Sequence, residues 1–332
     1  MNNMESKKIQ LGLIGAGGVG QLHLKNGLAL SGAEVTAVAD TSKSVLERAK
    51  AQGIKNLYTD YAEMLKNPQI DAVIIAVPTH LHHICALHAA EAGKHIFLEK
   101  PITVSVEQAK EVILATQRNS VKLMMGYPMR FNRRFLKLKS DLAEGIIGDP
   151  INVHATYVCC GPFGHRSDGH SPAPVPDWWF NAQLSGGGVL ADLGCHIINL
   201  LRMLFGEIVD IKGQFGYRYH MDFEDSAMCL ARFTSGTLAA INVGWYAQEY
   251  LLRLDVLGSV QNASVGHMPP KTIPAAYQML TKGISEFNQP HFDELQYFVN
   301  CLHTNQEPSP TGLDGLRDLE AIAKAYTNKI NI

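Results

Sequence analysis

The first third of the chain alternates short apolar runs with stretches of helical periodicity. Residues 71–77 are nearly all apolar, as expected of a strand covered on both faces, and Pro78 ends the run. Asp60 and Glu63 form a capping box ahead of a short helix. Such repeated strand–helix–strand units predict a parallel sheet with right-handed crossovers. The expected strands are 9–14, 34–39, 71–77, 95–98 and 121–125, and the expected helices are 19–30, 42–52, 80–92 and 104–118.

After Gly126 the pattern changes to longer strands that follow one another with few helices between them. This predicts a largely antiparallel sheet in a second domain. We therefore place one domain at 1–126 and another at 127–332. A helix is expected near Gly188, and the tail is expected to be helical. The expected strands are 151–160, 207–217, 225–233, 236–246 and 251–257, and the expected tail helices are 293–301 and 315–329.

Composition agrees with two domains and excludes several classes of function. The chain has 332 residues, of which 46% are hydrophobic and 18% charged, and its formal net charge is −2. The low charge fits either a surface buried against a second copy or simply a Gly- and Ala-rich enzyme. No block of Lys and Arg suggests nucleic-acid binding. The polar start has no signal-peptide core, and no apolar run is long enough for a membrane span.

Cysteine usage favours a reducing compartment. None of the six cysteines forms a C-x-x-C pair, and most lie in apolar segments, where a free thiol behaves as a small core residue. We expect reduced thiols and a cytoplasmic protein.

Glycine spacing after the first strand predicts a dinucleotide site. Gly15 permits a tight turn, Gly17 lets the backbone approach a pyrophosphate, and Gly20 lets the helix pack on the sheet. Free amides at the start of the helix, near Gly18 and Val19, then face the phosphates. In this strand–turn–helix context the motif is typical of a Rossmann domain.

Asp40 ends the second strand about 20 residues after the glycines, where a carboxylate binds the ribose 2′-hydroxyl. The alternative is that Asp40 only caps the following helix, and both roles can hold at once. Its charge favours NAD over NADP, although Ser42 and Lys43 leave NADP open.

Two further motifs carry candidate chemistry. Glu99-Lys100-Pro101 directly follows a strand, and Pro101 makes a rigid turn that is compatible with a cis bond. Asp192 and His196 lie four residues apart, so in a helix they share one face. A carboxylate can orient an imidazole that serves as a general base. Taken alone, Lys100 fits a solvated surface lysine, and Asp192 with His196 fits an ordinary surface contact.

Together these motifs resemble the Gfo/Idh/MocA oxidoreductase family, which includes glucose–fructose oxidoreductase and inositol dehydrogenases. The resemblance covers nearly the whole chain and rests on the glycine turn, on 92–101 and on 186–196. It implies an α/β N-terminal Rossmann domain followed by an α+β domain with an open, mostly antiparallel sheet. The open face often makes the oligomer contact, which implies a homo-oligomer, either a dimer or a tetramer.

The resemblance also implies roles for individual residues. Lys100 bridges cofactor and substrate, and His196 accepts the proton. Asp192 polarises or orients the substrate or His196. Many relatives have an aspartate where this chain has Asn199, which puts in question the pairing beneath the helix. The residues expected to contact the cofactor are Gly15, Gly17, Gly18, Val19, Asp40, Thr41, Ser42, Lys43, Val77, Pro78, Thr79, His80, His82, Glu99 and Lys100.

Further histidines and aromatic residues are weaker candidates. The group His80, His82, His83 and His88 lacks nearby carboxylate or cysteine partners at ligand spacing, so no metal is expected. Trp faces suit sugar rings, although packing is the more common fate of at least one of the two Trp residues. The residues expected to line a substrate pocket are Tyr127, Arg130, His165, Trp178 and Trp179.

These observations favour NAD(P)-dependent interconversion of a secondary alcohol and a ketone on a small polyhydroxylated substrate, a sugar, sugar derivative or inositol. Hydride passes to the nicotinamide and the proton to His196. Two other functions stay open. One is a glycoside-cleaving enzyme that keeps and recycles its NAD. The other is a sensor that binds NAD or sugar without chemistry, against which the presence of Lys100, Asp192 and His196 argues.

Overall fold

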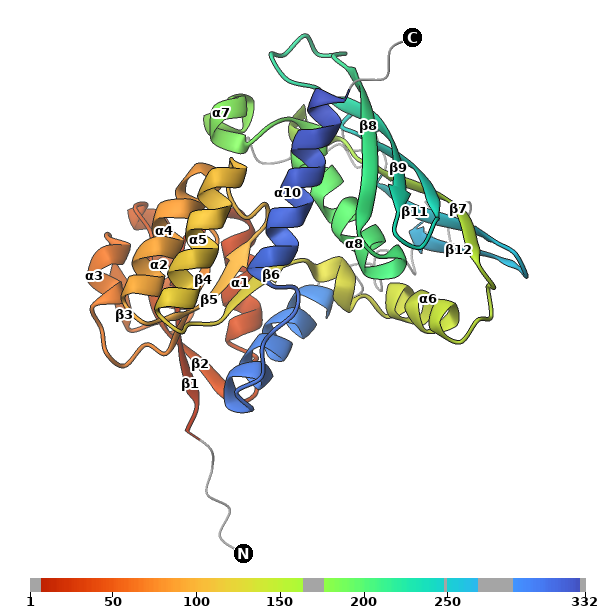
Figure 1. The fold of residues 1–332 in the computed structure, drawn as a ribbon. Coiled ribbons are helices and arrows are strands. Elements are labelled where there is room, and N and C mark those ends of the chain that lie inside the picture. Colours follow the sequence, from red (N-terminus) through yellow and green to blue (C-terminus); the bar gives the residue numbers. More distant parts are fainter. Residues whose placement is uncertain (1–6, 164–175, 248–249, 268–288, 329–332) are drawn as a thin grey trace, which may run out of the picture. The chain divides into compact units, whose positions relative to one another are not determined.

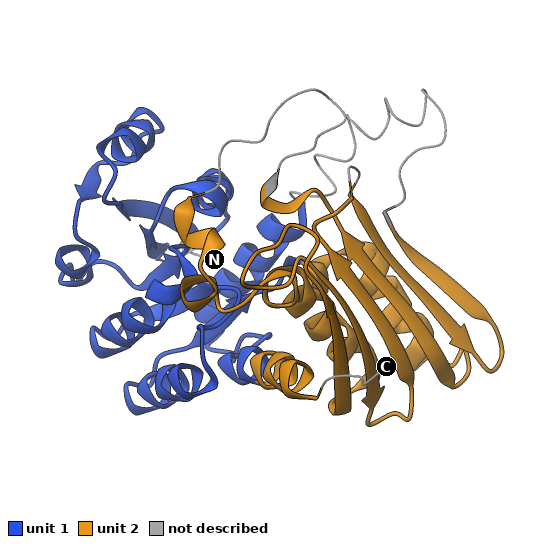
Figure 2. Ribbon diagram, turned by 90° about the horizontal axis from the view of Figure 1, so that it is seen from above, with its two compact units in different colours: residues 1–128, 287–316 blue, residues 129–286, 317–332 orange. Residues whose placement is uncertain are grey.

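The computed structural model describes residues 7–163, 176–247, 250–267 and 289–328. The chain divides into two compact units, which Figure 2 colours separately. Unit 1 consists of residues 1–128 and 287–316, and unit 2 consists of residues 129–286 and 317–332. Each unit has its own sheet.

Six parallel strands form the sheet of unit 1 (Figure 1). They are β1 (Ile9–Ile14), β2 (Ala33–Ala39), β3 (Asn56–Tyr58), β4 (Ala72–Ile75), β5 (His95–Glu99) and β6 (Leu123–Gly126). Their order in space is β3-β2-β1-β4-β5-β6, which confirms the expected Rossmann architecture. Strand β4 is buried at every position, which explains its uniformly apolar sequence. The order reverses between β1 and β4, and ligands bind outside the carboxyl ends of the strands at such a point.

The helices of unit 1 connect these strands. They are α1 (Gly18–Gly27), α2 (Lys43–Ala51), α3 (Tyr61–Leu65), α4 (Thr79–Glu91), α5 (Val106–Arg118) and a helix at 289–303. Asp60 caps α3 by accepting a hydrogen bond from the Ala62 amide at 2.8 Å, as predicted. Glu63 pairs with Lys66 rather than completing the capping box. The helix at 289–303 packs on the sheet through Phe298, whose ring lies 5.9 Å from that of Phe97.

Unit 2 is built on a second six-stranded sheet. Its strands are β7 (Pro150–Val158), β8 (Ile208–Gly216), β9 (Ser226–Phe233), β10 (Leu238–Gly244), β11 (Leu251–Gly258) and β12 (Asn262–His267). The order is β12-β11-β7-β10-β9-β8, and only the β7–β10 pair is parallel. The expected mostly antiparallel sheet is therefore confirmed. Strand β12 has no apolar alternation of its own, so its pairing with β11, rather than its sequence, defines it.

Helical segments of unit 2 include two that the sequence reading missed. The segments are α6 (Arg133–Ala143), α7 (Ala182–Ser185), a π-helical turn η4 (Leu190–Gly194) and α8 (Cys195–Phe205), together with α10 (Gly312–Thr327) from residue 317 onward. Short 3-10 turns occupy Pro128–Phe131, Gly161–Phe163 and Asp177–Phe180. The amphipathic helix α6, which buries Phe135 and Leu138, and the π-turn were not predicted.

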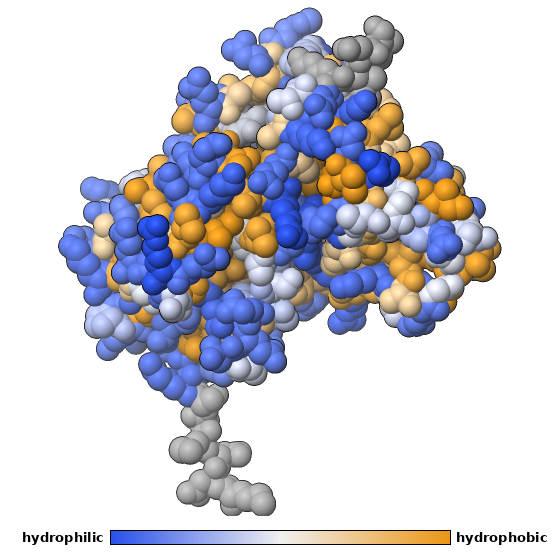
Figure 3. All heavy atoms as spheres, viewed as in Figure 1, coloured by the Kyte–Doolittle hydropathy of each residue, from blue (hydrophilic) through white to orange (hydrophobic). Residues whose placement is uncertain are grey.

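The two faces of the second sheet differ in burial. Alternate positions such as Val153, Cys229 and Ile241 are buried on one face. On the other face Met228, Leu230 and Leu238 remain 61%, 57% and 50% exposed. Leu230 pairs across the ladder with Ala240, and Leu238 pairs with Arg232, so these side chains are neighbours. In Figure 3 apolar side chains reach the surface over the strands of unit 2 as well as over unit 1.

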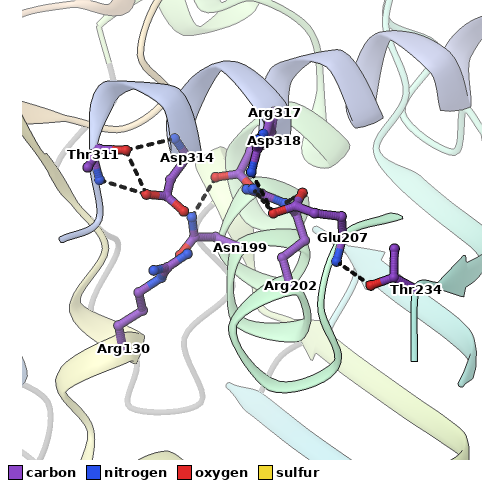
Figure 4. A network of polar contacts seen from close by, with 9 residues as sticks. All are labelled: Arg130, Asn199, Arg202, Glu207, Thr234, Thr311, Asp314, Arg317 and Asp318. Atoms are coloured by element: carbon purple, nitrogen blue, oxygen red, sulfur yellow. Dashed lines mark hydrogen bonds and ion pairs between the residues drawn. The ribbon is translucent and has the colours of Figure 1, made fainter. Parts of the chain in front are cut away.

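A buried polar network ties the last helix of unit 2 to α8 (Figure 4). Arg202 donates to Asp318 at 2.5 Å and makes a two-pronged pair with Glu207 at 2.9 and 3.0 Å. Burial lowers the pKa of Arg202, but Glu207 and Asp318 outweigh it and hold that pKa above its ordinary value. Asn199 donates to the other Asp318 oxygen at 2.6 Å. Buried charges of this kind are tolerated because every one has a partner.

Among the described residues, one helical stretch at 182–205 meets the length and hydropathy of a membrane span. Its most apolar window is 78% buried inside the protein, which is the pattern of a core helix.

Asp318→Ala is expected to lower the free energy of unfolding by about 3 kcal/mol, because it leaves the buried Arg202 and Asn199 without one partner each. Glu207 still pairs with Arg202, which keeps the cost at the lower end of the range for broken buried pairs. Arg317→Ala breaks only a half-exposed contact with Glu207 and should cost less than about 1 kcal/mol. Urea unfolding of the two variants tests this, and equal destabilisation would contradict it.

Candidate active site

The glycine-rich turn follows β1 in the geometry that its sequence requires. Gly15 has φ of +83°, and a Cβ there would lie 2.6 Å from the Ala76 carbonyl oxygen. At Gly20 a Cβ would lie 2.1 Å from the Gly15 carbonyl oxygen. By contrast, nothing lies within 4 Å of the Cβ positions of Gly17 and Gly18. Gly15 permits the turn and Gly20 permits the close packing of α1, whereas the open space at Gly17 and Gly18 is available to a ligand.

Helix α1 begins within this turn, and no side chain caps its first backbone amides among the described residues. Its N-cap, Gly17, has no side chain to cap the first amides, and the first turn contains no acidic residue. Val19 is 39% exposed. Uncapped amides at the start of a helix attract phosphate through hydrogen bonds and the helix dipole. The cradle therefore suits the pyrophosphate of a dinucleotide.

Asp40, at the end of the β2 region, holds the turn in place. Its carboxylate accepts hydrogen bonds from the amides of Ala16 at 2.9 Å and Ser42 at 2.8 Å. Ser42, rather than Asp40, is the N-cap of α2, with Thr41 before it and Lys43 after it. Each carboxylate oxygen can accept a further bond, so Asp40 can support the turn and still receive a ribose hydroxyl.

His82 joins the loops that follow β4 and β5. Its ring nitrogens lie 2.7 Å from the Pro101 carbonyl oxygen and 3.0 Å from the Val77 carbonyl oxygen. Burial lowers the pKa of His82, while the two carbonyl contacts oppose that effect. Pro78 is the N-cap of α4, and Thr79 and His80 are its first residues. His82 is 1% exposed, and its two contacts join the loop after β4 to the loop after β5.

Glu99 holds the backbone of Lys100. One carboxylate oxygen lies 2.5 Å from His23 Nε2, and the other accepts the Lys100 amide at 3.1 Å. Burial raises the pKa of Glu99, but His23, His291 and Lys100 outweigh it and hold that pKa below its ordinary value. The Lys100–Pro101 bond is cis, as the sequence reading allowed. Lys100 itself is half-buried directly after β5.

The other histidines after β4 turn to separate partners. His83 Nε2 lies 2.7 Å from Glu111, and His88 Nδ1 lies 3.1 Å from the Tyr61 hydroxyl. Among the described residues no three His, Cys, Asp or Glu side chains are grouped to hold a metal ion.

In unit 2 the candidate catalytic helix starts against a buried carboxylate. Glu224 accepts hydrogen bonds from the Leu190 amide at 2.9 Å and from the Tyr326 hydroxyl at 2.7 Å. Burial raises the pKa of Glu224. A Cβ at Gly188 would lie 2.1 Å from the Glu224 carbonyl oxygen, and Gly187 has φ of +138°. The triple glycine is thus required by close packing and an unusual backbone.

Asp192 lies in the π-turn η4, and His196 lies one residue into α8. A π-turn is wider than an α-helical turn and occurs often at functional sites. The Tyr157 ring lies 6.2 Å from that of His196 and 5.4 Å from that of Tyr250. Burial, Tyr250 and, to a smaller extent, Asp192 raise the pKa of Tyr157. The structure therefore brings Asp192, His196 and the two tyrosines together.

The sequence reading missed both tyrosines. Tyr157 occupies an inward position of β7, where it looks like an ordinary core residue, so only the packing of β7 on η4 and α8 identifies it. Glu224 was missed for a similar reason, because it belongs to no sequence motif and acquires its partners by folding.

The residues expected to line a substrate pocket lie in different environments. Tyr127 is 1% exposed in unit 1. In unit 2, Arg130 Nε donates to Asn199 at 2.6 Å, so Asn199 links Arg130 to Asp318. The Trp179 ring lies 5.7 Å from Trp178 and 6.2 Å from Trp245, which is packing of the kind expected for at least one tryptophan. His165 lies outside the described residues.

Comparisons with known proteins agree with this geometry. An oxidoreductase family with an NAD-binding Rossmann fold, GFO_IDH_MocA, matches residues 9–127, and the GFO/IDH/MocA C-terminal domain matches residues 135–263. Fold, glycine turn and family model together define an NAD-binding oxidoreductase. The chain belongs to the GFO/IDH/MocA family, so the resemblance drawn from its motifs is confirmed.

Individual relatives span nearly the whole chain. The uncharacterized oxidoreductase YrbE of Bacillus subtilis is 28% identical, with 94% of this chain and 92% of the relative covered. Myo-inositol 2-dehydrogenase of Thermotoga maritima is 26% identical, with 92% of each covered. Scyllo-inositol dehydrogenase of Lactobacillus casei, solved with NAD(H) and scyllo-inositol, shares the fold at a TM-score of 0.82 and 22% identity over 97% of each chain.

Gly17→Ala is expected to weaken NAD binding at least about tenfold, or about 1.4 kcal/mol, without lowering Tm. The added methyl meets no protein atom but occupies the space open to the pyrophosphate. Gly20→Ala is the contrasting variant, because its methyl overlaps the Gly15 carbonyl and should lower Tm. Calorimetric titration with NAD and thermal melts measure both. Unchanged NAD affinity in Gly17→Ala would place the cofactor elsewhere.

Proposed function

We propose that this NAD-dependent oxidoreductase oxidises a secondary hydroxyl of an inositol, sugar or sugar derivative to a ketone, or reduces the ketone. The observation that carries the proposal is Lys100, a half-buried cation at the carboxyl end of β5 whose backbone amide is held by Glu99. A second observation supports the proposal, because Asp192 and His196 lie near the buried Tyr157. The inositol dehydrogenases among the relatives support this substrate class.

Each side chain has a role in this reaction. Bound NAD supplies the hydride acceptor. His196 takes the hydroxyl proton as the carbon–hydrogen bond breaks and the carbonyl forms, and Asp192 orients it or the substrate. The Lys100 ammonium stabilises negative charge that develops on the substrate oxygen. Residues of the loops after β1, β2 and β4 hold the cofactor, with Asp40 on the adenosine ribose.

The proposal is tested with a panel of inositols, hexoses, sugar acids and nucleotide sugars, each with NAD and with NADP, followed through absorbance of the reduced cofactor. We expect one substrate class to respond, and NAD to be preferred because Asp40 repels a 2′-phosphate. NAD binding without reduction by any member would favour the sensor. Glycoside cleavage without net NADH would favour the cofactor-recycling enzyme.

Lys100→Met serves as the control for the panel. It should lower kcat with the responding substrate by about 100-fold or more while NAD affinity changes by less than about threefold, because its charge acts on the reacting oxygen. Turnover equal to that of the wild type would remove Lys100 from the mechanism.

We also propose that the protein is a cytoplasmic homo-oligomer joined through the exposed apolar face of the second sheet. None of the cysteines in the described part of the chain forms a disulfide, which suits a reducing compartment. Met228 and Leu230 lie on this face and are each more than half exposed, and apolar patches of this kind mark interfaces.

The double variant Met228→Asp, Leu230→Asp is expected to have the mass of a monomer by light scattering, because carboxylates on both surfaces repel and cannot be buried. Leu114→Asp, on α5 of unit 1 and 47% exposed, is the matched control and should leave the mass unchanged. A wild-type protein that is already monomeric would refute the proposal.

A further inference from the structure

A buried carboxyl group that the proposed reaction does not use lies next to Glu99. Glu294, on the helix at 289–303, is 0% exposed, and neither of its oxygens has a hydrogen-bond partner of good geometry among the described residues. His23, also 0% exposed, uses Nε2 for Glu99, and no described residue forms a hydrogen bond with its Nδ1. A buried, unpaired carboxylate is far too costly to persist, so such a group must be neutralised or paired.

Aromatic side chains pack around the cluster of Glu294, Glu99 and His23. The His23 ring packs edge-on against Phe97 at 5.3 Å, and Phe97 packs on Phe298 from the same helix as Glu294. On β6, a Cβ at Gly126 would lie 3.2 Å from Glu99 Oε1, so the glycine there leaves room that a side chain would narrow. Water has little access to the cluster, and the local dielectric is correspondingly low.

The charged groups that face Glu294 can be named element by element. Glu99, at the end of β5, acts on Glu294 directly, while His23 from α1, Lys100 after β5 and His291 from the helix at 289–303 act on Glu99. Burial, and then the negative charge of Glu99, raise the pKa of Glu294 well above its ordinary value, and the backbone of Tyr127 opposes them only weakly. Two carboxylates side by side in an apolar site do not both ionise, and Glu99 has the stabilising partners.

We propose that Glu294 is a neutral, protonated carboxylic acid, and that by remaining neutral it leaves Glu99 as the single anion that His23 and the Lys100 amide share. Glu294 is thus a positioning residue for Lys100. The acid contacts neither substrate nor cofactor. The protonated state of Glu294 stands on the cluster alone, whereas its effect on turnover rests on the proposed function of Lys100.

The protonated state has a defined effect on stability. The folded protein retains the Glu294 proton, whereas the unfolded chain loses it near the ordinary glutamate pKa of about 4.3. Between that value and the raised folded pKa, the native state binds more protons, so the free energy of unfolding falls as pH rises. Glu294→Gln mimics the neutral acid and lacks this slope.

Two measurements test the protonated state without any enzyme assay. The infrared spectrum of the wild type minus that of Glu294→Gln, both at neutral pH, should show the carbonyl band of a protonated carboxylic acid. Bands of other buried acids, such as Glu224, are the same in both proteins and are removed by the subtraction. The Tm of Glu294→Gln should exceed that of wild type by an amount that grows with pH. Asp293→Asn, one residue away and hydrogen-bonded to Gln289 at 2.7 Å, should show neither effect.

A third measurement tests the positioning role with the NAD-loaded enzyme and its substrate. Glu294→Ala should lower kcat by up to about 100-fold with little change in KM, because Lys100 is misplaced, and Glu294→Gln should restore most of the rate. If the wild type shows no infrared band of a protonated acid at neutral pH, the proposal is overturned, and this measurement needs no variant. Equal kcat in the wild type and both variants overturns the positioning role of Glu294. If no substrate is ever found, the infrared and melting results still decide the state of Glu294.

Discussion

A parallel sheet places the carboxyl ends of all its strands at one edge, and the cofactor half of this protein depends on that constraint. Gly15, Asp40, Val77 and Lys100 follow four different strands, yet the sheet order brings their loops to the same edge. Short hydrogen bonds then join the loops in pairs. Asp40 holds the glycine turn, and His82 ties the loop after β4 to the loop after β5.

Buried polar groups fix the two candidate reactive segments, and each does so within its own unit. Glu99 accepts the Lys100 amide in unit 1, and Glu224 accepts the Leu190 amide in unit 2. In both units the carboxylate is itself held by a second side chain, His23 or Tyr326. A buried polar group with all its partners resists displacement, because any movement would leave it unsatisfied in a low dielectric. Reactive side chains need such support to keep their geometry.

Much of the fold and part of the site followed from local sequence signals. The apolar run 71–77 became the fully buried β4, and the glycine spacing became the turn before α1. These predictions were correct because a strand covered on both faces and a tight turn each restrict which residue types can occupy them. Strand β12 and the π-turn at Leu190–Gly194 were missed, since one is defined by its pairing with β11 and the other by a single extra residue per turn.

The sequence by itself determined that the N-terminal part of the chain is a Rossmann domain that binds a nicotinamide dinucleotide, because its glycines, strand ends and helix starts restrict residue type locally. Lys100, Asp192 and His196 became candidate reactive groups only through the resemblance of their motifs to the family. Only the tertiary structure decided that Glu99 pairs with His23, that Tyr157 lies beside His196 and that Glu294 is buried next to Glu99. Those contacts join residues far apart in the chain, and burial, not residue type, sets their charge.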